Sequence, residues 1–124
     1  MKYLILFFLF GSLFSCQQGT QTNVNSFKKG KFKTILDDGK TVSYAVRNDS
    51  LQIETTNNKV DTFKIKWINN FEYVLVKKNP KDLLDSLPFH VKITSVNKDG
   101  YDFIAHYKRS NFKQKGKAIQ LKNK

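Results

Sequence analysis

Apolar and polar residues alternate along most of this chain in short segments, and this pattern limits its fold more than any other feature. Residues 42–47, 63–67 and 89–94 show it clearly, since every second side chain is a large apolar one. A period of two is that of a β-strand with one buried face. Eight strands are predicted in this way, at residues 31–36, 42–47, 51–56, 63–67, 71–76, 89–94, 101–107 and 119–121.

Turn-forming residues, such as Asp38-Gly39 and Asn57-Asn58, stand between the predicted strands. They tolerate the positive φ angles of tight hairpins, so neighbouring strands are expected to pair antiparallel. Eight meandering strands close most simply into a small lipocalin-like barrel, an all-β fold without exposed edges. A two-sheet sandwich is the alternative. A mostly filled interior is predicted, because the expected inward side chains are large and include Phe32, Tyr44, Phe63, Trp67 and Phe103.

One helix signal interrupts the strands. Asn79 can cap a helix that begins at Pro80, and Asp82 places an acidic group in its first turn. Pro88 would end it. We expect one short helical turn near residues 80–87, which would cover an open end of the barrel with Leu83, Leu84 and Leu87.

The amino-terminal segment has the pattern of an export signal. Lys2 precedes an almost wholly apolar run at residues 3–14, which is too short to span a bilayer, because a span takes about 20 apolar residues. We expect residues 1–15 to be a signal peptide, residues 16–26 a polar, flexible linker that starts at a lipid-bearing cysteine, and residues 27–124 one barrel domain.

Cys16, the only cysteine, follows this run. Leu13-Phe14-Ser15-Cys16 resembles a bacterial lipobox, although Phe14 is bulkier than usual there. The resemblance implies that Cys16 carries fatty acyl groups and tethers the mature chain to a membrane without spanning it. The alternative is an uncleaved anchor or a buried thiol. Gln17 and Gln18 lack the acidic run of Bacteroidetes surface-sorting signals, which implies an outer-membrane lipoprotein facing the periplasm.

Basic residues outnumber acidic ones, 22 Lys and Arg against 10 Asp and Glu, for a net charge of +12. Such an excess attracts acidic surfaces over a long range. In a bacterial envelope these are anionic head groups or acidic proteins, whereas nucleic acid is a poor candidate outside the cytoplasm.

A first candidate site joins two predicted strands. A three-residue loop at Lys98-Asp99-Gly100 would pair Asn97 with Tyr101, and this register predicts His90, Lys92, His106 and Lys108 on one outward face. Like charges directly opposed destabilise a sheet, so a bound anion would relieve the patch. The alternative is that neutral histidines cover a solvated face.

A second candidate site surrounds the predicted turn at Asn69-Asn70. A two-residue turn would send five side chains outward as a surface for a protein partner or a lipid layer: Lys64, Lys66, Phe71, Tyr73 and Leu75. Because segment 71–76 is apolar on both faces, a longer turn that makes Tyr73 and Leu75 part of the core is the alternative.

Catalytic motifs are absent from the sequence, which contains no Gly-rich phosphate loop, no His-Glu zinc motif and no nucleophile elbow. Glu54 and Glu72 are the only glutamates in predicted strands, and we cannot pair them across one pocket. Two histidines without a matching carboxylate or cysteine rarely hold a metal. We therefore expect no enzyme, no metal and no cofactor beyond the covalent lipid.

Three stretches behind the lipobox carry a family resemblance: DSLQIET, KVDTFKIKWINNFEYVLVKKNPKDLLD and HVKI. They resemble a family of short lipoproteins from Flavobacteria and related Bacteroidetes, over nearly the whole mature chain. That family commonly has Asp and Cys where this chain has Asn70 and Phe71. Some members bear a DNA topoisomerase IV label, which this sequence does not support, because it has no room for an ATPase or a DNA gate.

The sequence thus predicts a non-catalytic envelope lipoprotein that acts as an interaction or accessory module. The alternative is a lipocalin-like carrier that holds a small hydrophobic ligand between Tyr44, Trp67 and Phe103. A continuous cavity of about 300 Å³ or more would favour the carrier, and a filled interior would favour the interaction module.

Overall fold

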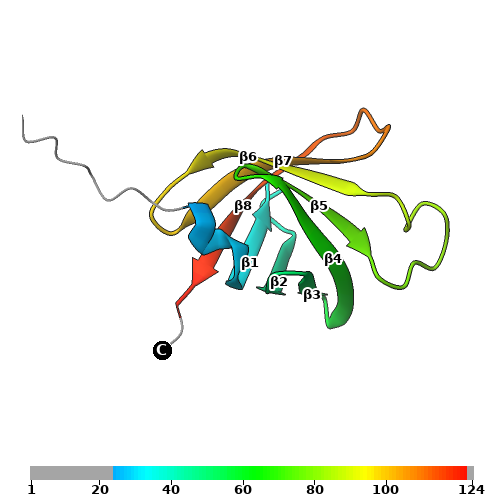
Figure 1. Cartoon of the computed structure of the whole chain (residues 1–124), viewed down its shortest axis with the longest axis horizontal. Coiled ribbons are helices and arrows are strands. Elements are labelled where there is room, and N and C mark those ends of the chain that lie inside the picture. The colour runs from blue at the N-terminus through cyan, green and yellow to red at the C-terminus, as the bar shows by residue number, and fades with distance from the viewer. Residues whose placement is uncertain (1–23, 123–124) are drawn as a thin grey trace, which may run out of the picture.

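The computed structural model describes residues 24–122. Eight antiparallel strands form a closed barrel in which each strand pairs with the next and β8 pairs with β1 (Figure 1). The predicted all-β meander barrel is therefore confirmed, and every strand finds both of its partners within these residues. In chain order the elements are η1 (Val24–Lys28), β1 (Gly30–Leu36), β2 (Val42–Arg47), β3 (Leu51–Thr56), β4 (Lys59–Asn69), β5 (Glu72–Lys77), β6 (Phe89–Val96), β7 (Gly100–Tyr107) and β8 (Gln114–Leu121).

The 3-10 helix η1 closes one end of the barrel. Its Phe27 is 1 % exposed and packs against Tyr101, with the ring centroids 5.4 Å apart. Gln120 Nε2 donates to the carbonyl oxygens of Ser26 (2.9 Å) and Lys29 (3.0 Å), which fixes the helix to the end of β8. The folded part thus begins by Val24, inside the predicted linker 16–26, because Phe27 fills the barrel end.

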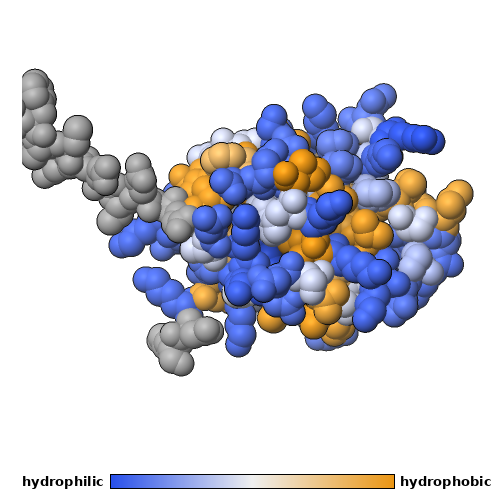
Figure 2. Space-filling model, in the orientation of Figure 1, coloured by the Kyte–Doolittle hydropathy of each residue, from blue (hydrophilic) through white to orange (hydrophobic). Residues whose placement is uncertain are grey.

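The opposite end of the barrel is bordered by the β5–β6 loop. The amides of Ser86 and Leu87 each donate to a carbonyl three residues earlier, over 3.2 Å, so residues 83–87 make single turns that do not extend into a helix. Leu83 and Leu84 are 83 % and 67 % exposed and do not cover the barrel as predicted, whereas Leu87 lines its mouth. Figure 2 shows apolar atoms at the right-hand end, where Figure 1 places this loop.

A bulge in β4, between Trp67 and Asn69, shifts its register with β5. Trp67 therefore lies opposite Tyr73, and not Lys66 as a two-residue turn predicted. A shift of one residue turns every side chain to the other face of a strand. Tyr73 and Leu75 are consequently buried, so the prediction that they face outward is wrong and the alternative that places them in the core is correct. The cause is the bulge and not a longer turn, because Asn69 pairs with Glu72 and the turn still has two residues.

A second bulge, between Ile93 and Ser95 in β6, changes the register with β7. His90 lies directly opposite His106, whereas the loop-based register had placed each histidine opposite a lysine. The predicted faces are nevertheless correct, because Val91 and Ile93 still point inward with Ala105 and Phe103.

Strands β2 and β3 face the opposite way from the sequence-based expectation. Ala45 lies opposite the buried Phe32, and opposed residues share a face, so Arg47 also points inward. Tyr44 is 50 % exposed, and its predicted place in the interior is wrong. The apolar half of each of these strands lies outside the barrel, and the polar half lines its interior.

Candidate ligand-binding site

Arg47 forms the floor of the hollow part of the barrel. Its Nε donates to Gln52 Oε1 (2.9 Å), and its Nη1 donates to the carbonyl oxygen of Phe27 (2.7 Å). Its Nη2 donates to the hydroxyls of Tyr73 (3.2 Å) and Tyr101 (3.0 Å). Among the described side chains no carboxylate forms a salt bridge with it, so the hydrogen bonds that offset the desolvation of this buried cation go to neutral oxygens.

Aromatic rings complete the environment of this guanidinium. Its Cζ lies 4.3 Å from the ring centroid of Phe32 and 4.8 Å from that of Tyr73. Desolvation acts to lower the pKa of Arg47, but the hydroxyls of Tyr73 and Tyr101 outweigh it, and the pKa lies above its ordinary value. Burial raises the pKa of Tyr73 well above its ordinary value, so this hydroxyl is neutral.

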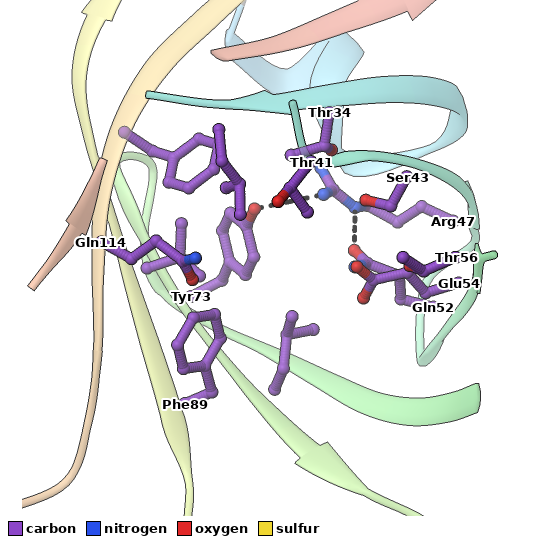
Figure 3. A pocket seen from close by; sticks show the side chains of 14 residues that line it. Thr34, Thr41, Ser43, Arg47, Gln52, Glu54, Thr56, Tyr73, Phe89 and Gln114 are labelled. Carbon is purple, nitrogen blue, oxygen red and sulfur yellow. Dashed lines mark hydrogen bonds between the residues drawn. The ribbon is translucent and has the colours of Figure 1, made fainter. Parts of the chain in front are cut away.

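A cavity of about 120 Å³ extends from this floor toward the open end (Figure 3). Its volume equals that of about four molecules of liquid water. One wall comes from β1–β3 and their turns and is polar, with Thr34, Thr41, Ser43, Gln52, Glu54 and Thr56. The facing wall comes from β5–β7 and is largely apolar, with Tyr73, Leu75, Phe89, Val91 and Phe103. The cavity is therefore amphipathic, with a polar wall facing an apolar one.

Glu54 is the acidic group of the polar wall. Burial raises the pKa of its carboxyl, and the nearby Asp61 acts in the same direction. Hydrogen bonds with Ser43 and Gln52 and the charge of Arg47 act to lower this pKa without cancelling the effect of burial. Glu54 forms no salt bridge within residues 24–122, so the fold keeps a partly desolvated carboxylate beside an open cavity.

A second hollow of about 240 Å³ lies at the mouth. It shares Glu54, Leu75, Phe89 and Gln114 with the deeper cavity, so the two adjoin. Lys77 Nζ stands in its wall, 3.4 Å from Asp61 Oδ1 and 3.2 Å from Asp85 Oδ2. The second of these ion pairs holds the β5–β6 loop against the barrel rim.

The predicted ligand pocket of Tyr44, Trp67 and Phe103 is correct only in part. Phe103 lines the deep cavity, and Tyr44 lies on the outside of the barrel. Trp67 lies at the closed end, where its ring is 4.7 Å from that of Tyr73, and its buried Nε1 has no hydrogen-bond partner among the described residues. Sequence reasoning missed Arg47 and Glu54, because both occupy the polar half of an alternating strand, which the pattern assigns to solvent.

The two histidines of the predicted anion patch lie side by side on the outer surface. Their rings are stacked, with centroids 5.5 Å apart and planes inclined by 18°. Lys92 is exposed on the same strand as His90, but it lies opposite Glu72 on β5. Lys108 is exposed and directly follows β7. The patch therefore holds a compact histidine pair and a carboxylate, and anion binding there stays a prediction.

The predicted partner surface around the β4–β5 turn is divided by the bulge. Lys64, Lys66 and Phe71 are exposed, whereas Tyr73 and Leu75 belong to the interior. Cys16 lies outside the described residues, and so do the predicted signal peptide and most of the predicted linker. Within residues 24–122 there is no group of three or more His, Cys, Asp or Glu side chains that could hold a metal ion. The same residues contain no helix that is long and apolar enough to cross a membrane.

No protein-family model, curated protein or solved structure matches this chain. The geometry of the barrel is therefore the basis for assigning a function to it.

Proposed function

We propose that this chain is a non-catalytic, lipid-anchored envelope protein whose barrel binds a small amphipathic ligand. The observation that carries the proposal is the two-sided hollow above Arg47, with Glu54 on one wall and an apolar wall opposite. The lipocalin-like carrier, which was the alternative function inferred from the sequence, is therefore the function that we propose first. The anchor at Cys16 remains part of the proposal on the strength of the lipobox resemblance.

The chemistry of the walls suggests the class of ligand. A desolvated carboxylate gains most from a cation or a strong hydrogen-bond donor, because either group favours its charged form. The side chains of Leu75, Val91 and Phe103 would receive the apolar part of the same molecule. A short-chain amine meets both requirements.

The size of the hollow limits the ligand to a small one. Ligand pockets usually measure about 300–1,000 Å³. The deep cavity of about 120 Å³ falls below this range, and the adjoining mouth of about 240 Å³ brings the combined hollow to its lower end. A large lipid would not fit without rearrangement, which separates this protein from carriers of long acyl chains.

Binding of three six-carbon probes tests the proposal. Methyl NMR spectra of the chain from Gln17 onward would be recorded with hexylamine, hexanol or hexanoate. We expect hexylamine to shift the methyl signals of Leu75 and Val91, hexanol to shift them less, and hexanoate to leave them unchanged. Glu54 repels a carboxylate, and the Arg47 guanidinium on the floor already donates to four protein oxygens. Equal shifts with hexanoate would contradict the assigned ligand chemistry.

Two variants locate the binding. Leu75→Phe adds volume at the junction of the two hollows and should abolish the hexylamine shifts at Val91. Val60→Phe makes a comparable change on the outside of the barrel, where Val60 is exposed, and should preserve them. If none of the probes shifts these signals, or if Leu75→Phe binds as the unchanged chain does, the interaction module becomes the better proposal.

A further inference from the structure

One outer face of the barrel, formed by β8, β1, β2, β3 and β4, exposes large apolar side chains in two rows across the strands. We call it the β1 face. The row nearer the helix runs Leu121, Lys31, Val46, Ile53 and Thr62. The next row runs Ile119, Lys33, Tyr44, Thr55 and Val60. Six of these ten residues are exposed large apolar ones.

Lysines interrupt both rows at the same strand. Lys31 lies between Leu121 and Val46, and Lys33 lies between Ile119 and Tyr44. The five strands contain two acidic residues, Glu54 and Asp61, and both line the interior hollows. The outward positions of these strands therefore carry lysine but no carboxylate, so the face is cationic as well as apolar.

We propose that the β1 face docks on an anionic lipid surface. Aromatic and aliphatic side chains that alternate with lysines suit the boundary between head groups and acyl chains, where the rings and branched chains enter the apolar layer and the ammonium groups stay among phosphates. An isolated apolar face would suit many partners. The two lysines among the apolar side chains, with no carboxylate at an outward position of these strands, favour phosphate head groups.

The start of the described chain lies at the edge of this face. Helix η1 precedes Lys31 by a few residues, and Gln120 beside Leu121 bonds the carbonyl of Ser26. Cys16 lies eight positions before Val24, so an extended chain of that length reaches about 29 Å at most. A tether at Cys16 would thus keep the β1 face within reach of the bilayer. Lys31, which is exposed, the half-buried Lys33 and the exposed apolar residues carry the proposal without this tether.

Vesicle flotation of the chain from Gln17 onward, which lacks the acylated cysteine, tests the face directly. The described strands close the barrel without earlier residues, so this part retains the whole sheet. We expect binding to vesicles of phosphatidylethanolamine and phosphatidylglycerol, and little binding to phosphatidylcholine alone. Each basic residue near an anionic leaflet contributes about fivefold to the binding constant. Lys31→Glu with Lys33→Glu should therefore weaken binding by roughly tenfold or more.

The matched control changes the same number of charges elsewhere. Lys78→Glu with Lys113→Glu alters exposed residues of the β5–β6 and β7–β8 loops and should leave vesicle binding nearly unchanged. Equal losses in the two double variants would mean that net charge alone drives binding, and the β1 face would then have no special role. Absence of binding to the anionic vesicles would overturn the proposal, as would binding of duplex DNA or an acidic protein in its place. Thermal melts of each variant verify that the barrel is intact.

Discussion

Arg47 Nη1 donates a 2.7 Å hydrogen bond to the carbonyl oxygen of Phe27, twenty positions earlier in the chain. This bond joins the helix that closes the barrel to the side chain that forms the floor of the cavity. The same guanidinium also holds Gln52, Tyr73 and Tyr101. The closed end is therefore organised around one buried cation, and not around apolar packing alone.

Replacement of Arg47 by Met should destabilise the protein strongly. The change keeps an unbranched side chain but leaves Gln52 Oε1 and the Phe27 carbonyl without their donor, and each buried unsatisfied polar group costs about 1–3 kcal/mol. We expect a loss of about 2–4 kcal/mol in the free energy of unfolding, measured by urea denaturation. Tyr101→Phe removes one of the four acceptors and should cost about 1 kcal/mol. Equal stability of the Arg47→Met variant and the unchanged protein would contradict this account of the closed end.

Glu54→Gln should stabilise the empty barrel at neutral pH while it weakens binding of hexylamine. The pKa of Glu54 is raised above its ordinary value of 4.5 by burial, so the folded protein binds this proton more tightly than the unfolded chain does. The contribution of Glu54 to the free energy of unfolding therefore falls as the pH rises from about 4.5 through the raised pKa. The two proteins should have similar stability below that window and differ above it. Urea titrations at several pH values measure this difference, and a variant that is less stable at neutral pH would refute it.

The number and order of the strands could be predicted because the signals for them are local. Each strand shows its own alternation, and turn pairs such as Asn57-Asn58 and Asp38-Gly39 adopt the positive φ angles expected of them at Asn57, Asn58 and Gly39. Neighbouring strands in a meander then pair without any long-range information. The closure of β8 on β1 followed from the advantage of leaving no edge.

The candidate site could not be predicted, because it depends on which face of each strand is turned inward. The bulge after Trp67 moves Tyr73 from the outside to the core, and no residue type marks that bulge in the sequence. On β2 and β3 the usual rule fails for another reason. Arg47 and Glu54 face a hollow interior with polar partners, while Tyr44 and its apolar neighbours cover an outer face. If polar residues are assumed to face solvent, the inward and outward faces of such strands are predicted the wrong way round.

Lys77→Met should release the β5–β6 loop from the barrel rim. Hydrogen bonds to Asp85 and Asp61 raise the pKa of Lys77, and the bonds that Asp85 accepts from Lys81 N and Lys77 lower the pKa of its carboxyl. Without the Lys77 ammonium group, Asp61 and Asp85 lose the cation with which both form ion pairs at the mouth of the barrel. We expect faster hydrogen exchange at the amides of Ser86 and Leu87, with little change at strand amides of β1. Lys78→Met, which removes a neighbouring exposed charge, should leave the loop amides unchanged.

The stacked histidines offer a test of the anion patch. If the patch binds phosphate, the ion should favour the charged imidazoles, so the NMR titration curves of His90 and His106 would move to higher pH when phosphate is added. Lys108→Gln should reduce this movement, and Lys113→Gln, a nearby exposed change on the β7–β8 loop, should not. Curves that coincide with and without phosphate would leave the pair as part of a solvated sheet face.

Acylation of Cys16 is the remaining prediction, and it concerns the segment before the described residues. A lipobox cysteine becomes the first residue of the mature chain, so the intact mass of the native protein should correspond to the chain from Cys16 onward plus fatty acyl groups. Two or more acyl chains hold a protein stably on a bilayer, and the native protein should remain in the membrane fraction at high salt. Cys16→Ser should prevent both the added mass and the salt-resistant attachment. A weaker, salt-sensitive association of this variant through Lys31 and Lys33 would remain, because screening by salt weakens exposed charges and leaves buried acyl chains in place.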